Sequence, residues 1–284
     1  MIDQRFKAGN FVVSRVPAWG IGKVLEILEE DKVRVFFEYE GEKLMLPDFL
    51  DSTLAPVLHP VLEKIDPLRT TEGFIPFHKL ETSFLNRYPL GFDDQKYFKD
   101  ERDYKINASG LLHESMSKEI LSRLIDQGDY ASVYDLTKKM IGKNNLIFRN
   151  EKISLFESLK KGVAEQKLFS NALYELLYGD AEIALRFDAF ADVLEKLDTC
   201  KWPIATYFTF LLDPSCHICV KPTYFQAAAR SYAFEINYVA RPRWACYRRI
   251  LKFVDHVGKQ LSKRSSLKPH DLIDVQGFIW CSLH

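Results

Sequence analysis

The spacing of apolar and polar positions divides the chain into a β part and a helical part. Over the first 57 residues, short runs of branched and aromatic residues are separated by turn signals about every ten positions, a pattern typical of short antiparallel strands. From Glu114 onward, apolar residues recur three and four positions apart, which indicates amphipathic helices. We therefore expect strands at 11–16, 21–28, 33–37 and 43–46.

These elements predict an α+β protein, with a small N-terminal antiparallel β-barrel followed by a mainly α-helical domain. Proline placement agrees, because no proline lies between Pro89 and Pro203, and a series of helices requires such a proline-free stretch. Aromatics and alternating charges between the two parts indicate an ordered connector. The expected domains are the barrel at 1–57, a connector packed on its neighbours at 58–111, a helical bundle at 112–200 and a further helical module at 201–284.

Three stretches of the first segment resemble a known family. Residues 6–10 (FKAGN), 17–24 (PAWGIGKV) and 32–37 (KVRVFF) are similar to the Tudor-like, SH3-type barrel of CarD-like proteins. A similar barrel is found at the C-terminus of UvrD-type helicases. The resemblance covers residues 5–56 and implies a docking module. Members of this class bind RNA polymerase or other nucleic-acid machinery, often by pairing a strand edge with a strand of the partner.

Trp19 and Gly20 lie in the turn before the second expected strand, and Gly22 lies at the start of that strand. We expect Gly20 and Gly22 to accept backbone angles that a side chain would forbid, which lets the chain leave a tight turn. Trp19 has two interpretations, as a plug of the barrel or as an anchor for a partner peptide. We keep it as a candidate protein-binding residue.

The neutral formal charge of the chain, with 39 basic and 39 acidic residues, is a cancellation. Residues 1–57 hold 7 Lys+Arg and 10 Asp+Glu, for a net charge of −3, and residues 58–200 hold 20 and 24, for −4. Residues 201–284 hold 12 and 5, for +7. A basic C-terminal module therefore follows an acidic body. Within this module, residues 217–223 (HICVKPT), 237–238 (NY), 241–244 (RPRW) and 271–276 (DLIDVQ) resemble the C-terminal part of uncharacterised bacterial proteins. This resemblance implies a discrete module and no particular activity.

The basic residues of this module are ordered along one expected helix at 243–263. Apolar residues fill about half of its circumference and a basic stripe fills the rest, with His256 and Gln260 on the polar half and Asp255 at the boundary. A stripe of one sign attracts nucleic-acid backbone. Alternatively, it is a solvated face whose cations pair with the acidic bundle. The candidate nucleic-acid contacts are Arg241, Arg243, Trp244, Arg248, Arg249, Lys252, Lys259 and Lys263, with Tyr238 as a further candidate for base stacking.

Two pairs of residues could hold a metal ion. Cys216 and Cys219 have the C-x2-C spacing of a zinc knuckle, although a closed zinc site needs two further ligands that only folding could bring. Asp271 and Asp274 lie one helical turn apart and could hold Mg²⁺ as in nucleases. For each pair the alternative is structural, namely buried thiols in a helical core and acids that stabilise a helix N-terminus.

The sequence contains no P-loop, nucleophile elbow, H-E-x-x-H motif or dinucleotide fingerprint. Our leading hypothesis is a non-catalytic adaptor of DNA or RNA transactions that needs no cofactor. Its acidic barrel would dock a protein such as RNA polymerase or a helicase, and its basic helix would contact nucleic-acid backbone. The alternatives are a metal-dependent nuclease or defence-system enzyme, and a scaffold that binds only proteins. The partner's identity, DNA against RNA, and the oligomeric state stay open.

The sequence also bears on location. The first ten residues contain no apolar stretch of the kind found in signal peptides. The longest apolar run, 202–212, is too short to span a bilayer. The five cysteines, an odd number, favour reduced thiols over a disulfide framework. We therefore expect a cytoplasmic protein that does not bind membranes.

Overall fold

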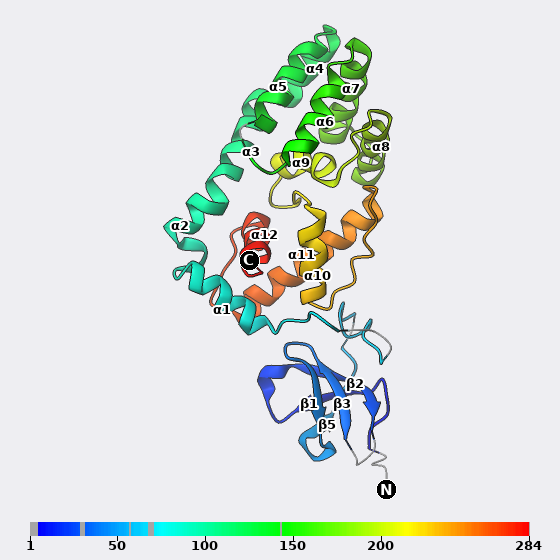
Figure 1. Ribbon diagram of the computed structural model, residues 1–284, viewed down its shortest axis with the longest axis vertical. Helices are drawn as coiled ribbons and strands as arrows, with labels where there is room; N and C mark the ends of the chain where they lie inside the picture. Colours follow the sequence, from blue (N-terminus) through cyan, green and yellow to red (C-terminus); the bar gives the residue numbers. More distant parts are fainter. Residues whose placement is uncertain (1–4, 29–31, 57, 68–70, 143, 284) are drawn as a thin grey trace. The chain divides into compact units, whose positions relative to one another are not determined.

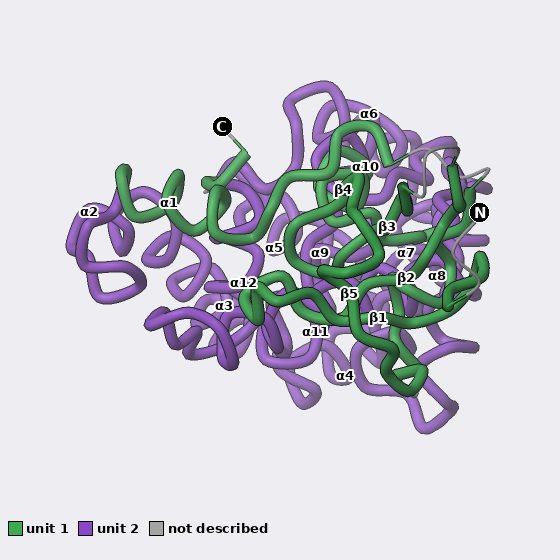
Figure 2. The backbone as a smooth tube through the Cα atoms, turned by 90° about the horizontal axis from the view of Figure 1, so that it is seen from below, with its two compact units in different colours: residues 1–87, 226–236, 281–284 green, residues 88–225, 237–280 purple. Residues whose placement is uncertain are grey.

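The computed structural model describes residues 5–28, 32–56, 58–67, 71–142 and 144–283. The chain forms two compact units, which are coloured separately in Figure 2. Unit 1 consists of residues 1–87, 226–236 and 281–284, and unit 2 consists of residues 88–225 and 237–280. No helix among the described residues is long and apolar enough to cross a membrane.

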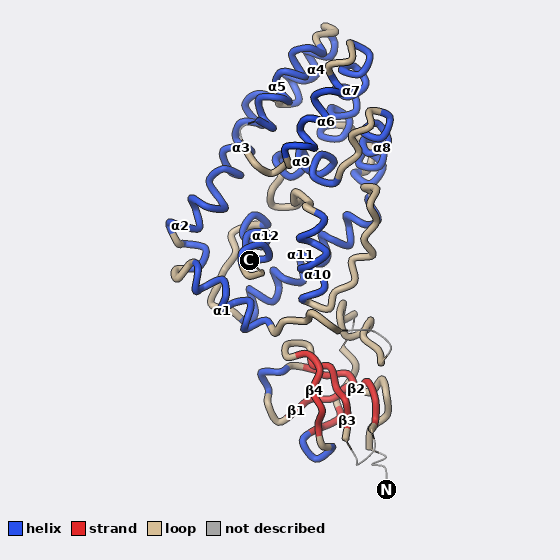
Figure 3. The backbone as a smooth tube through the Cα atoms, viewed as in Figure 1, coloured by secondary structure: helices blue, strands red, loops and turns tan. Residues whose placement is uncertain are grey.

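Unit 1 contains a five-stranded antiparallel sheet, drawn in red in Figure 3. The strands are β1 (Phe11–Ser14), β2 (Ile21–Ile27), β3 (Val33–Phe37), β4 (Gly41–Met45) and β5 (Leu50–Ser52). Strands β1 to β4 confirm the four expected strands, with small shifts at their ends. The short strand β5 was not expected, and it pairs with β1 to give the order β4-β3-β2-β1-β5.

One face of the sheet forms the apolar core of unit 1, because successive side chains of a strand point to opposite faces. The register of β2 against β3 shifts between Val24 and Glu26, and this irregularity allows Val24 and Leu25 both to be buried. The half-buried Trp19, Ile27 and Met45 pack against this core. Its buried members are Phe6, Val12, Val24, Val33, Val35, Phe37 and Leu50.

Gly20 and Gly22 are constrained in different ways. Gly20 has a φ angle of +74°, which confirms the expected use of glycine in the turn. Gly22 has an ordinary strand backbone and lies opposite Phe37. A Cβ atom on Gly22 would lie 2.6 Å from Cγ1 of Val35. The expectation of a special backbone angle is therefore wrong at Gly22, where the constraint is the space between neighbouring side chains.

Helices make up most of the remaining chain, as an α+β protein requires (Figure 1). Helical structure begins at Phe77, well before the expected Glu114. The periodicity is hidden in part because the charged Lys105 occupies a buried position. The helices are α1 (Phe77–Arg87), α2 (Gln95–Tyr97), α3 (Asp103–Ser115), α4 (Lys118–Asp126), α5 (Tyr130–Gly142), α6 (Arg149–Leu159), α7 (Val163–Tyr178), α8 (Ile183–Lys196), α9 (Trp202–Leu212), α10 (Pro222–Ser231), α11 (Trp244–Arg264) and α12 (Leu272–Cys281), with a π-helical turn, η5 (Phe98–Arg102), between α2 and α3.

Helix α9 lies at the centre of the unit 2 core. Every residue from Trp202 to Leu211 is buried, and α3, α7 and α8 all pack against the helix. A helix that is apolar all round needs such neighbours on every side. Its buried hydroxyls are satisfied within the core, because Thr206 donates to the carbonyl of Trp202 over 2.8 Å and Tyr207 donates to that of Met140 over 3.0 Å.

Candidate functional site

Helix α11 is amphipathic, as the sequence predicts. Its apolar side is fixed on α8, where the ring of Tyr247 stacks on Phe187 with centroids 5.1 Å apart and planes 7° apart. His256 and Gln260 belong to the buried side, at 9% and 7% exposure, and contact each other over 3.1 Å. Their expected place on the polar half is therefore wrong. The exposed side carries Arg248, Arg249, Lys252, Lys259 and Lys263.

The two arginines that precede α11 are ion-paired with acids of α8. Arg241 Nη2 lies 3.0 Å from Asp192 Oδ1 and also contacts Glu195. Arg243 Nη1 lies 2.7 Å from the same oxygen of Asp192. The hydrogen bond from Arg243, together with both positive charges, lowers the pKa of Asp192 despite an opposing contribution from burial. At Arg241 and Arg243, the basic stripe therefore pairs with acids of the same chain, which is one of the two interpretations of the stripe.

The aromatic candidates pack against neighbouring side chains. Trp244 is half-buried, with its ring 5.9 Å from Phe187. Tyr238 is also half-buried, with its ring 6.3 Å from Trp202. In unit 1, the ring of Trp19 lies 5.2 Å from Phe37 of the sheet core. Each ring is therefore a packing element in this structure, and a role in stacking bases or anchoring a peptide stays a prediction.

The two cysteines of the C-x2-C pair lie in different environments. Cys216 is exposed, whereas Cys219 is buried. Burial raises the pKa of the Cys219 thiol to about 12, and its Sγ contacts the carbonyl of Pro203 at 3.9 Å. Zinc binds thiolates, which this environment disfavours. Among the described residues, no group of three or more His, Cys, Asp or Glu side chains is arranged to hold a metal.

We therefore expect the two thiols to react at very different rates. At pH 8, a thiol reagent such as 5,5′-dithiobis(2-nitrobenzoate) should modify Cys216 rapidly, and Cys219 at least about a thousandfold more slowly, because few Cys219 thiolates form and access is blocked. The rates are measured by absorbance and the sites by mass spectrometry. The variant C216S should lose the fast phase. Equal rates for the two cysteines, or protection of both by added zinc, would contradict this assignment.

Asp271 and Asp274 share one partner, the guanidinium of Arg102. Arg102 Nη2 lies 2.8 Å from Asp271 Oδ2, and Nη1 lies 2.7 Å from Asp274 Oδ1. Asp271 also accepts the backbone N–H of Ile273 at the start of α12 over 2.9 Å. Tyr97 donates to Asp274 over 2.9 Å. Arg102 thus supplies the positive charge that these carboxylates need, and their geometry matches the structural alternative.

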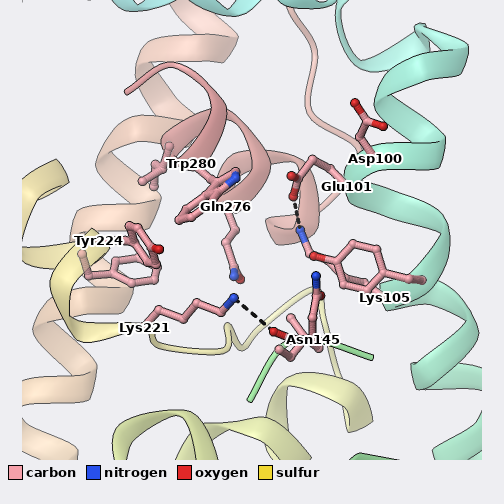
Figure 4. Close-up of a pocket in the computed structure, with 12 residues that line it drawn as sticks. Asp100, Glu101, Lys105, Asn145, Lys221, Tyr224, Gln276 and Trp280 are labelled. Carbon is pink, nitrogen blue, oxygen red and sulfur yellow. Dashed lines mark hydrogen bonds and ion pairs between the residues drawn. The ribbon is translucent and has the colours of Figure 1, made fainter. Parts of the chain in front are cut away.

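A pocket of about 100 Å³ lies within unit 2, beside the start of α3, the start of α10, and α12 (Figure 4). Glu101 and Lys105 line one side, and Lys105 Nζ donates to Glu101 Oε2 over 3.1 Å. Lys105 is only 2% exposed, and this carboxylate compensates its charge in the buried site. The two residues form a neutral pair in the pocket wall.

The other side of the pocket is aromatic and carries a second lysine (Figure 4). The rings of Tyr224 and Trp280 meet edge to face, with centroids 4.0 Å apart. Lys221 Nζ lies 5.7 Å from the Trp280 ring and 5.0 Å from the Phe148 ring, and donates to the carbonyl of Asn145 over 3.3 Å. Burial lowers the pKa of Lys221. The ammonium is held by a carbonyl and two ring faces.

Gln276 of α12 reaches into the pocket between these two sides (Figure 4). Its Nε2 donates to the carbonyl of Cys219 over 3.3 Å. Its Oε1 has no hydrogen-bond partner among the described residues, although the side chain is only 9% exposed. A buried acceptor without a donor costs about 1–3 kcal/mol. The pocket therefore contains an unused acceptor.

The pocket was not predicted from the sequence. Local signals exist, because Glu101 and Lys105 are four residues apart, as are Gln276 and Trp280, and residues at this spacing share a helix face. No sequence pattern indicates that these two faces meet across more than a hundred residues. Comparisons of the chain with protein-family models, with curated proteins and with solved structures found no match.

Proposed function

We propose that the protein is a non-catalytic adaptor of nucleic-acid transactions, in which the exposed face of α11 holds the phosphate backbone. The main support for this proposal is the alignment of four exposed cations, Arg248, Lys252, Lys259 and Lys263. At about 100° and 1.5 Å per residue, they fall within a sector of about 60° and extend over about 22 Å of helix. A duplex presents a phosphate charge every 1.7 Å or so along its axis, which suits such a row of cations.

The exposed part of the stripe differs from its paired end. Arg241 and Arg243 are engaged by α8, whereas within the described part of the chain Arg248, Lys252 and Lys263 have no carboxylate at ion-pair distance. Lys259 pairs with the exposed Asp255 at 2.7 Å, which removes one charge from the row. Solvent-exposed pairs are weak, about 0–1 kcal/mol, so a polyanion can compete with Asp255. This difference favours nucleic-acid binding over intramolecular pairing for the exposed face.

We propose further that the sheet of unit 1 is an SH3- or Tudor-like barrel that docks a cytoplasmic protein, as the resemblance to CarD-like and UvrD-type modules implies. The pairing of the last strand, β5, with the first strand, β1, supports this topology. Strand β4 lies at a sheet edge, where Leu44, and Leu46 just after the strand, are 55% and 49% exposed. An edge strand with exposed apolar side chains can accept a partner strand.

The salt dependence of binding tests the proposal for α11. The full-length protein should bind 20-bp DNA or RNA duplexes, and log K should fall linearly with log salt concentration with a slope of about −3 to −4 for four phosphate contacts. Fluorescence anisotropy of labelled duplexes at 50 to 300 mM KCl provides the measurement. Absent binding, or binding that salt does not weaken, would overturn the proposal.

A further inference from the structure

The pocket among Lys221, Gln276 and Trp280 contains two lysines, of which Lys105 has a carboxylate partner and Lys221 does not. Lys105 is balanced by Glu101 at 3.1 Å, and the exposed Asp100 pairs with Lys96 at 3.6 Å. Within the described residues, Lys221 Nζ has no carboxylate at ion-pair distance. Its hydrogen-bond partner is the carbonyl of Asn145, so two of its three N–H donors have no acceptor in the part of the chain that the structure describes. Lys221 is therefore a pocket cation without an anionic partner among the described residues.

The size of the pocket limits which anion can pair with Lys221. A cavity of about 100 Å³ is smaller than the roughly 300–1,000 Å³ pockets that hold drug-sized ligands. It can enclose one anionic group with a few carbon atoms, while a ring at the mouth lies against Tyr224 and Trp280. A dianion such as phosphate would leave a surplus negative charge beside Glu101, whereas a monoanion neutralises Lys221.

We propose that this pocket binds a small monocarboxylate with a flat apolar body. The carboxylate accepts from the free N–H groups of Lys221, and the body covers the aromatic wall of Tyr224 and Trp280. The buried Oε1 of Gln276, which has no partner among the described residues, accepts from a hydroxyl or N–H group next to the carboxylate. This inference is independent of α11, because none of the pocket residues belongs to that helix.

Isothermal titration of the full-length protein with four probes tests the inference. Phenylacetate supplies the carboxylate and the ring, phenylacetamide is its neutral counterpart, mandelate adds one hydroxyl, and inorganic phosphate, at the mildly alkaline pH of the titration, is mainly a dianion. We expect phenylacetate to bind at least about tenfold more tightly than phenylacetamide, and mandelate to bind more tightly than phenylacetate. Phosphate should bind more weakly than either acid.

The variants K221M and K152M locate the site. Lys152 is a matched control, because its Nζ donates to the carbonyl of Asn144 as that of Lys221 does to Asn145, and Lys152 does not line the pocket. K221M should weaken phenylacetate binding at least about tenfold, and K152M less than about twofold. The amide comparison uses the wild-type protein, so it holds even if K221M folds poorly. Equal binding of acid and amide, tighter binding of phosphate, or unchanged binding by K221M would overturn the proposal.

Discussion

The variant R102M should lose about 3–5 kcal/mol of unfolding free energy. Asp274 is 0% exposed, and its carboxylate lies 2.7 Å from Arg102 Nη1. Methionine preserves much of the side-chain volume but removes the charge, so Asp274 would remain in the core with Tyr97 and His270 as its side-chain partners among the described residues. An uncompensated buried charge is among the most destabilising changes in a protein. Urea unfolding followed by tryptophan fluorescence measures the loss.

A second arginine provides a matched control for this experiment. Arg241 also bridges two acids, but its side chain is 45% exposed, and R241M should therefore cost less than about 1 kcal/mol. The double variant R102M/D274N should recover part of the loss, because the unpaired charge is removed with its partner. Unfolding of R102M at the wild-type urea concentration would show that the network does not stabilise unit 2.

The sequence predicted those parts of the fold that depend on the local pattern of apolar and polar residues. Alternating branched residues predicted β1 to β4, and the helical spacing of apolar residues predicted the amphipathic face of α11. β5 was missed because three residues, Leu50–Ser52, carry too little pattern, and the strand forms only by pairing with β1. Gly22 was misinterpreted because its constraint comes from Val35 and Phe37 on a neighbouring strand. These errors concern contacts between elements, which the sequence of one element does not contain.

For the candidate site too, the sequence predicted the features of single helices and did not predict the contacts between helices. Helix geometry places the exposed cations of α11 correctly, although it also placed the buried His256 and Gln260 on the polar half. That Arg243 pairs with Asp192, 51 positions earlier in the chain, depends on how α8 packs. The same holds for Arg102, which unites two acids that could equally have held a cation. Sequence spacing identified these side chains, and tertiary packing chose their partners.

Charge reversal on α11 should produce the largest change in binding. The variant R248E/K252E/K263E replaces three aligned cations with anions, which should repel the phosphate backbone and weaken binding of a 20-bp duplex at least about a hundredfold. The matched control K138E/K139E/K167E changes the net charge by the same amount at exposed lysines of α5 and α7. Because long-range repulsion affects both variants equally, the difference between them reports on the α11 face itself.

The most direct test of the α11 assignment is the anisotropy titration of these two variants beside the wild-type protein, with DNA and RNA duplexes, at several salt concentrations. We predict that the control binds within about threefold of wild type at 150 mM salt, where exposed charges more than about 8 Å apart are largely screened. The α11 variant should lose both its affinity and about three-quarters of the salt slope. Equal binding by the two variants would contradict the central claim that the face formed by Arg248, Lys252, Lys259 and Lys263 holds nucleic acid.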